Sequence, residues 1–204
     1  MKADAELLQR GGALVAAAVL IERASSSTPG RTIDRRLFEV VNSERGPGPD
    51  RFFAGLTELG SITASIAAAG VLAATGRHRT AARALGSAAA TWFVGQGLKR
   101  LYLRARPYDT FTVRLLIGKP RGTSWPSSHP AVLYSFLTVA GRELDLSRAA
   151  RAALAGIAGL VATSRVYLGV HYPSDVVAGM MLGRGIGLCG VAIGNGSRAG
   201  RRGA

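Results

Sequence analysis

The chain has 204 residues, which fits one domain of ordinary size or two small ones, and its formal net charge is +14. The single cysteine, Cys189, excludes an intrachain disulfide and a cysteine-based metal site. A basic surplus suits anionic partners, but here the basic residues are scattered at the ends of apolar stretches. This pattern indicates loops that flank membrane spans and argues against nucleic-acid binding.

The first apolar run, GGALVAAAVLI, covers residues 11–21. It is short for a membrane span, and runs of this length also occur in signal peptides. Asp4 and Glu6 fit poorly with the basic start of a signal peptide. We therefore expect residues 1–27 to form a short first span, with a signal-like segment as the alternative. Either choice places the chain after Ser25 outside the cytoplasm.

A polar segment follows at residues 28–50, and its middle part reads IDRRLFEVVN. The apolar residues of this part share one helical face: Ile33, Leu37, Val40 and Val41. The pattern predicts an amphipathic helix that lies on the membrane surface, and an ordinary surface helix is the alternative.

Five further stretches carry few charges or none: residues 52–76, 84–98, 127–141, 152–164 and 176–194. Together with the first run they predict an all-α fold, a polytopic membrane bundle of five to six short spans. The stretches are rich in Ala and Gly, which lets membrane helices pack closely. A soluble all-helical bundle remains the alternative. Glu58 and Arg184 are charges within predicted spans, and the sequence assigns them no role.

The order of the spans predicts which loops share a side of the membrane. If residue 30 is outside, the basic segment RHRTAAR at residues 77–83 is cytoplasmic, as the positive-inside tendency prefers. The polar segments 99–126 and 165–175 then both lie on the extracytoplasmic face. We expect one domain over residues 28–195 and a basic, disordered tail over residues 196–204.

Three clusters of residues that could take part in a reaction lie in the two outer segments and at the start of the span 127–141. They are Lys99, Arg106 and Pro107; then Pro126, Ser127, Ser128 and His129; then Arg165, His171 and Asp175. Guanidinium groups match phosphate oxygens, and a carboxylate near an imidazole fixes its tautomer. Proline at position 173 predicts a helix that starts there, which places the His171 and Asp175 positions one turn apart. The PSSH segment resembles a helix start, where serine caps and free amides bind an anion.

Taken singly, these residues have simpler interpretations. Lys99 and Arg106 fit side chains that reach to the membrane surface, and His129 fits a histidine at a helix end. Arg165 and Asp175 fit a buried ion pair. The two serines fit ordinary helix caps.

Together the clusters resemble the type 2 phosphatidic acid phosphatase (PAP2) family, which also includes the vanadium haloperoxidases. The family pattern is K-x6-R-P, then P-S-G-H, then S-R-x5-H-x3-D. Six residues separate Lys99 from Arg106-Pro107, and the third motif runs from Ser164 to Asp175 with matching spacing. The middle motif departs at Ser128, where the family usually has glycine. If that glycine is needed for a positive φ or a close approach, the serine reduces activity.

The resemblance implies a role for each matching residue. His171 is the expected nucleophile that forms a phosphohistidine, and Asp175 orients it. His129 is the expected acid and then base. Phosphate binding is expected from the remaining residues: Lys99, Arg106, Ser127, Ser128 and Arg165. No metal or other cofactor is expected.

The resulting hypothesis is a multi-pass cell-membrane lipid phosphatase with an extracytoplasmic active site. Phosphatidic acid, phosphatidylglycerol phosphate and polyprenyl (di)phosphate, including carriers for cell-wall synthesis, are all compatible substrates. A vanadate-dependent haloperoxidase and a non-catalytic membrane protein that binds lipid phosphate are the alternatives. The sequence does not indicate the oligomeric state.

Overall fold

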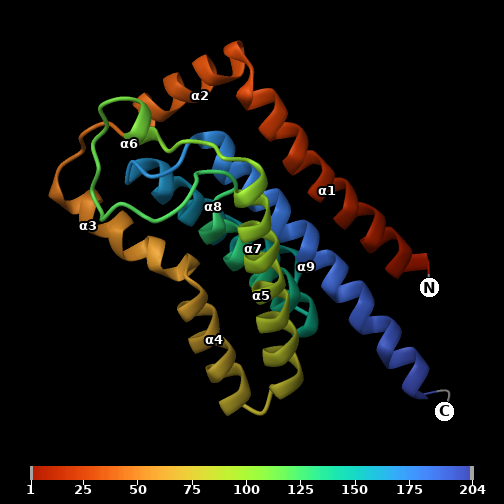
Figure 1. Ribbon diagram of the computed structural model, residues 1–204. Helices are drawn as coiled ribbons and strands as arrows, with labels where there is room; N and C mark the ends of the chain where they lie inside the picture. Colours follow the sequence, from red (N-terminus) through yellow and green to blue (C-terminus); the bar gives the residue numbers. More distant parts are fainter. Residues whose placement is uncertain (1, 203–204) are drawn as a thin grey trace.

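The computed structural model describes residues 2–202, with side chains up to Gly196, and within this range every regular element is helical. The helices are α1 Lys2–Ser26, α2 Thr28–Val41, α3 Pro47–Leu56, the 3-10 helix η1 Thr57–Gly60, α4 Ile62–Ala74, α5 His78–Leu101, α6 Pro107–Thr110, α7 Ser128–Glu143, α8 Arg148–Tyr167 and α9 Pro173–Arg202. The predicted all-α class is confirmed (Figure 1).

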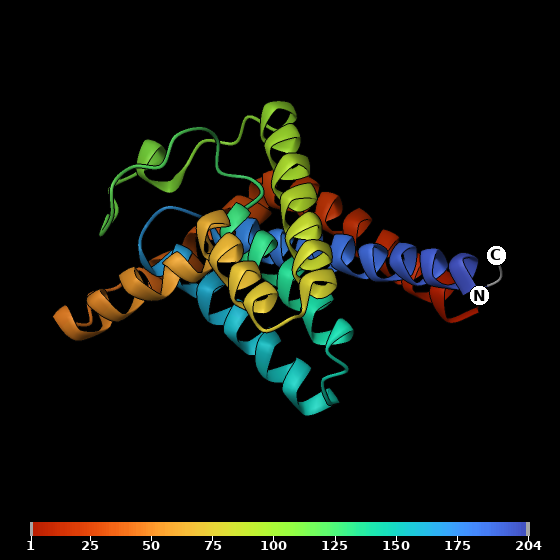
Figure 2. The ribbon, with the colours of Figure 1, turned by 90° about the horizontal axis from the view of Figure 1, so that it is seen from below.

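Helix α7 forms the centre of the bundle and contacts α4, α5, α8, α9 and η1. Figure 2 shows it between the α4–α5 pair and the helices α8 and α9. Residues 130–141 of α7 carry no charge, and almost all of them are buried. A helix that is uncharged on all sides is typical of the buried centre of a bundle.

Glycines on α9 allow its backbone to come into direct contact with the backbone of α7. A Cβ atom at Gly183 would lie 2.1 Å from the carbonyl oxygen of Ala131, and one at Gly179 would lie 2.4 Å from that of Ser127. Gly187 continues the same row four residues later. This small-residue spacing is the usual means of close helix packing in membranes.

Helix α1 packs along α9 over much of its length (Figure 1). The apolar run of residues 11–21 is only the middle of this helix. Gly11 on α1 faces Gly185 on α9, and Ala18 joins a buried cluster with Trp125 and Leu182. The N-terminal segment therefore contributes to the packing of the bundle.

Within the described residues, two helices are each long and apolar enough to cross a membrane: α8 and the part Pro173–Gly196 of α9. The segment 52–76, expected as one span, is divided among α3, η1 and α4 with a bend of 65°, and the bent pair is together long and apolar enough to count as a third, broken span. Two local features explain the break. Gly60 packs against His129, and Ser61 Oγ accepts a hydrogen bond of 3.0 Å from the amide of Ala64, which caps α4.

Helix α2 is confirmed, and its apolar face is turned away from the protein. Leu37 and Val40 are 51% and 66% exposed, whereas Asp34 and Phe38 on the other side are buried. An uncovered apolar face suits a membrane surface, and that location stays a prediction. At the other end of the chain, α9 continues to Arg202 through most of the tail predicted to be disordered, and residues 203–204 lie outside the described range.

Candidate active site

The eight residues singled out from the sequence lie at one end of the bundle. Lys99 lies in the last turn of α5 and Arg165 in the last turn of α8. Ser127, Ser128 and His129 lie at the start of α7, and Asp175 lies in the first turn of α9. Helices α5 and α8 run opposite to α7 and α9, so their C-terminal ends meet the N-terminal ends of the other two (Figure 1). Antiparallel packing therefore brings together residues that are 76 positions apart in the chain, from 99 to 175.

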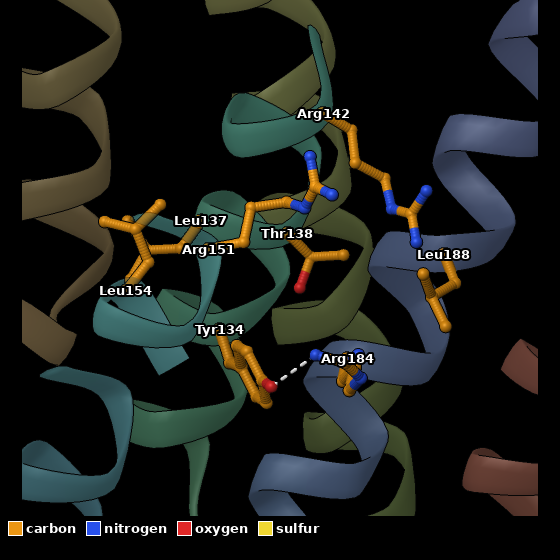
Figure 3. A pocket seen from close by; sticks show the side chains of 8 residues that line it. All are labelled: Tyr134, Leu137, Thr138, Arg142, Arg151, Leu154, Arg184 and Leu188. Atoms are coloured by element: carbon orange, nitrogen blue, oxygen red, sulfur yellow. Dashed lines mark hydrogen bonds between the residues drawn. The ribbon is translucent and has the colours of Figure 1, made fainter. Parts of the chain in front are cut away.

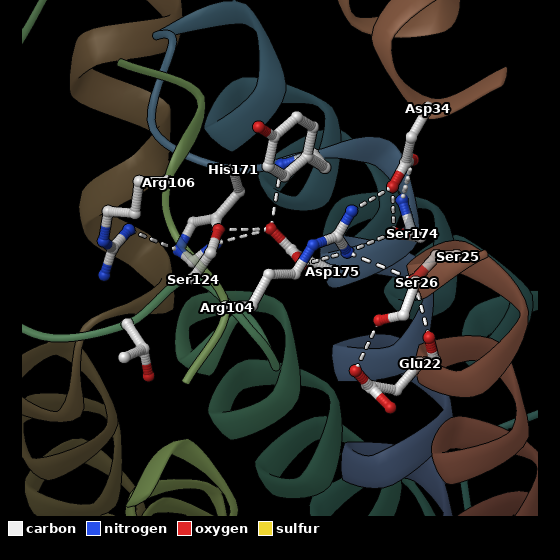
Figure 4. A network of polar contacts seen from close by, with 12 residues as sticks. Glu22, Ser25, Ser26, Asp34, Arg104, Arg106, Ser124, His171, Ser174 and Asp175 are labelled. Carbon is white, nitrogen blue, oxygen red and sulfur yellow. Dashed lines mark hydrogen bonds and ion pairs between the residues drawn. The ribbon is translucent and has the colours of Figure 1, made fainter. Parts of the chain in front are cut away.

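Asp175 holds one side of the His171 ring. Its Oδ2 atom lies 3.4 Å from Nδ1 of His171 and accepts hydrogen bonds from Ser124 Oγ at 2.5 Å and from the Tyr172 amide at 2.9 Å (Figure 4). The short loop before α9 and the helix start at Pro173 place the two side chains one turn apart, as predicted. The imidazole thus has a fixed orientation.

Arg106 defines the other side of the ring, because its Nη1 atom lies 3.1 Å from Nε2 of His171. A guanidinium group can only donate, so Nε2 carries the lone pair and Nδ1 carries the proton that faces Asp175. Burial lowers the pKa of His171 well below 6.5, and the nearby charges of Arg106, Lys99 and Arg165 lower it further. The ring is therefore neutral, with its nucleophilic nitrogen turned toward the cations.

The cations are held by backbone and hydroxyl oxygens rather than by carboxylates. Lys99 Nζ donates to the carbonyls of Thr123 and Ser124 at 2.8 and 3.1 Å. Burial, followed by the charge of Arg106, lowers the pKa of Lys99 to about 7. Arg165 Nη1 donates to Thr57 Oγ1 at 2.9 Å. These bonds fix the positions of the side chains and leave their positive charge available to an anion.

Several buried donors at this end have no partner among the described residues. They are the hydroxyls of Ser127 and Ser128 and the Nε atom of Arg165. The simpler alternative, that Ser127 is an ordinary helix cap, is not supported, because Ser127 occupies the cap position of α7 without a side-chain hydrogen bond. Unpaired buried donors beside fixed cations are what a multi-oxygen anion such as phosphate would satisfy. The positive charges of Arg165, Arg106 and Lys99 all act on the His129 side chain, so His129 belongs to the same cluster.

A family model described as the PAP2 superfamily matches residues 80–198, more than half of the chain. The chain belongs to the PAP2 superfamily. The matched region contains all eight candidate residues. Within the described range, no group of three or more His, Cys, Asp or Glu side chains could hold a metal ion.

Curated relatives of this PAP2 protein include three kinds of phosphatase. A decaprenylphosphoryl-5-phosphoribose phosphatase of Mycobacterium tuberculosis is 32% identical over 52% of this chain and 56% of its own length. An undecaprenyl-diphosphatase of Sulfolobus acidocaldarius is 35% identical over 49% and 48% of the two chains. A lipid A 1-phosphatase of Rhizobium etli is 35% identical over 42% and 38%. The chain spans about half the length of the curated relatives it matches.

Two solved structures share the PAP2 fold with this chain. LpxE of Aquifex aeolicus has a TM-score of 0.70 and 26% identity, over 76% of this chain and 93% of its own. A transmembrane PAP2-type phosphatidylglycerolphosphate phosphatase of Bacillus subtilis has a TM-score of 0.75 and 21% identity, over 93% and 96% of the two chains. Both similarities show the fold, and the apolar helices α8 and α9 support membrane association.

Ser128, the departure from the PAP2 pattern, fits without backbone strain. It is the first residue of α7 and is not among the residues with positive φ in the described chain. A Cβ atom added at Gly95 of α5 would lie 3.9 Å from its hydroxyl. The small neighbour leaves room for the serine side chain. Because φ is not positive here, the backbone does not require glycine either.

The sequence did not predict the two residues that support the other carboxylate oxygen of Asp175, the one that does not face His171. Arg104 Nη1 donates to Asp175 Oδ1 at 2.8 Å, and its Nη2 donates to Asp34 of α2 at 2.5 Å (Figure 4). The alternative of an Arg165–Asp175 ion pair is not found, since Asp175 pairs with Arg104. Arg104 is an unspecified position of the first motif, and Asp34 lies 65 residues before Lys99. Neither a motif position nor a short spacing in the sequence therefore marked these two residues as part of the site.

Proposed function

We propose that this PAP2 protein is a multi-pass membrane lipid phosphatase that uses His171 as its nucleophile. The observation that carries this proposal is the Nε2 atom of His171, which lies 3.1 Å from Arg106 beside buried donors that have no partner in the described part of the chain. A phosphoryl group that binds would replace the direct contact between Arg106 and His171. Its oxygens would accept from the cations, while its phosphorus would face Nε2.

The proposed reaction has two steps. In the first, His171 Nε2 attacks phosphorus, the bond to the lipid oxygen breaks, and His129 donates a proton to the departing oxygen. The negative charge of the substrate offsets the cations around His129 and so favours its protonated form. In the second, a water molecule loses a proton to His129 and attacks the phosphohistidine. Inorganic phosphate leaves, and His171 is neutral again.

The proposed substrate is a polyprenyl phosphate or diphosphate. Two of the relatives described above are named for polyprenyl substrates, and the third is named for lipid A, which is also a lipid phosphate. A long apolar tail suits a site at the end of a bundle of apolar helices. Phosphatidic acid and phosphatidylglycerol phosphate belong in the same test.

We infer that the active site faces the extracytoplasmic side. The end of the bundle opposite His171 carries the turn before α5 and the loop between α7 and α8, where Arg77, Arg79, Arg142 and Arg148 lie. Short basic loops favour the cytoplasmic side. A membrane-impermeant substrate added to sealed, oriented vesicles tests this assignment.

Phosphate release from a panel of lipid phosphates, with and without a chelator, tests the function and its metal independence. The proposal expects release from at least one polyprenyl substrate, unchanged by chelator, and none with His171→Ala. His78→Ala is a matched control at the far end of α5, and it should keep full activity. Wild-type rates in His171→Ala would overturn the assignment. Absence of release with bound lipid phosphate would favour the non-catalytic alternative, and halide oxidation with vanadate would favour the haloperoxidase.

A further inference from the structure

A second basic cavity lies between α7, α8 and α9, away from His171. Its volume is about 50 Å³, several times the roughly 10–15 Å³ that one water molecule needs. Arg142, Arg151 and Arg184 line it together with Thr138 (Figure 3). Arg142 follows His129 by 13 residues along α7, or about 20 Å at 1.5 Å per helical residue. The cavity therefore lies toward the opposite end of the bundle from the candidate active site.

The three guanidinium groups have no carboxylate partner in the described part of the chain. Arg184 donates to Tyr134 Oη at 2.5 Å, and Arg151 donates to the carbonyl of Leu146. The charges that act on Arg142 are those of Arg151, Arg184 and Arg10, which all repel it. Arg142 and Arg151 are half-buried and Arg184 is exposed, so solvent screens part of their mutual repulsion, and an anion bound among them would relieve the rest.

Thr138 provides an independent observation. Its side chain is buried with 8% exposure, and its hydroxyl has no partner among the described residues. Figure 3 shows this oxygen among the arginine side chains. A buried hydroxyl can donate one hydrogen bond and accept others, so a ligand oxygen in the cavity would satisfy it.

The position of Arg184 indicates which class of ligand the cavity could bind. It lies in the part of α9 that is apolar enough to cross a membrane, where an unpaired charge is costly. Leu137, Leu154 and Leu188 line the same cavity, so cationic and apolar groups share one site. Basic pockets between membrane helices are suited to phospholipid headgroups.

We propose that this arginine cavity binds a phosphate group, supplied either by an anionic phospholipid of the opposite leaflet or by inorganic phosphate. Arginine forks bind phosphate oxygens in pairs, and Thr138 adds a further hydrogen bond. The site is independent of the reaction at His171. Its occupant neutralises the cluster and ties α7, α8 and α9 together at this end.

The test measures binding by the purified full-length protein in detergent. One arm counts bound dioleoyl phosphatidylglycerol by native mass spectrometry, with dioleoylglycerol as the lipid that lacks phosphate. The other arm titrates inorganic phosphate by calorimetry. Both arms are run in an Arg165→Ala protein, in which phosphate binding at the His171 site is weakened. Binding of phosphatidylglycerol would identify a phospholipid headgroup as the source of the phosphate, and binding in the calorimetric arm would identify inorganic phosphate.

Arg142→Gln/Arg184→Gln should weaken binding about tenfold or more, since each lost charged hydrogen bond contributes on this order. Arg148→Gln removes an exposed arginine one turn away on α8 and should change nothing. With His171-site residues intact, Arg142→Gln/Arg184→Gln should keep its phosphatase rate, which reports correct folding. If the glutamine variant does not fold, Arg142→Lys/Arg184→Lys keeps the charge and should retain binding. Equal binding by the Arg148→Gln and Arg142→Gln/Arg184→Gln proteins, or no binding in either arm, would overturn the proposal.

Discussion

Arg104 joins Asp34 of α2 to Asp175 of α9 through one guanidinium group, with contacts of 2.5 and 2.8 Å. Asp175 in turn holds the His171 ring. The Ser174 amide also donates to Asp34 at 2.9 Å, so α2 fixes the start of α9 at two points. The amphipathic helix therefore contributes to the geometry of the candidate nucleophile through Arg104 and Asp175.

Asp34→Asn should lower kcat by about 10- to 100-fold with little change in KM, because a small displacement of a reacting group is costly. The fall in kcat would come from greater mobility of the Arg104 and Asp175 side chains, because Asp34→Asn removes no contact with the substrate. Glu39→Gln is the matched control, since Glu39 lies on the same helix in an exposed pair with Arg35. A change in KM alone, or equal losses in both variants, would contradict a positioning role.

Arg165→Ala should reduce kcat/KM by about 10²- to 10³-fold, the usual loss for one donor that stabilises transition-state charge. Arg165 has a buried Nε atom without a partner in the described chain, which a phosphoryl oxygen would occupy. Thermal unfolding in detergent should be measured beside the rate. A loss of activity that merely follows a loss of folded protein would speak against a direct contact with substrate.

The apparent affinity for substrate should fall above pH 7, because the pKa of Lys99 is lowered to about 7 by burial and by Arg106. Above that pH the free enzyme carries a neutral lysine, and binding of a phosphate dianion requires uptake of a proton. KM should then rise by up to about tenfold per pH unit, since binding is linked to that proton. Lys99→Arg stays charged and should flatten the profile between pH 7 and 9. The same slope in both proteins would exclude Lys99 as the titrating group.

Ser128→Gly should change kcat/KM by less than about tenfold, since one neutral hydrogen bond contributes on the order of 1 kcal/mol. The backbone at this position is helical, so the replacement needs no rearrangement. Recovery of activity by several orders of magnitude would show that the serine impairs the site.

Gly183→Ala should destabilise the protein by roughly 1–3 kcal/mol or more, as is typical of overpacking. The added Cβ would meet the carbonyl of Ala131 on α7, and backbone cannot move aside as a side chain can. Gly86→Ala is the matched control within a helix, because nothing lies within 4 Å of its added Cβ. Equal unfolding temperatures for the two variants would contradict the close α7–α9 contact.

The sequence by itself determined the helical class and singled out the candidate site residues, because both are local or depend on fixed spacing. The uncharged stretches predict helices, and proline at position 173 begins α9 as expected. It could not show that residues 52–76 break at Gly60, because the break depends on the contact with His129, which is distant in the chain.

Only the tertiary structure decided which charges meet. The sequence offered Arg165 as the partner of Asp175, but the fold selects Arg104, because α2 carries Asp34 to the start of α9. It likewise gave Arg184 no role, since the approach of Arg142 and Arg151 depends on the packing of three helices. Side-chain pairing over long sequence separations is fixed by helix packing, and no local pattern encodes it.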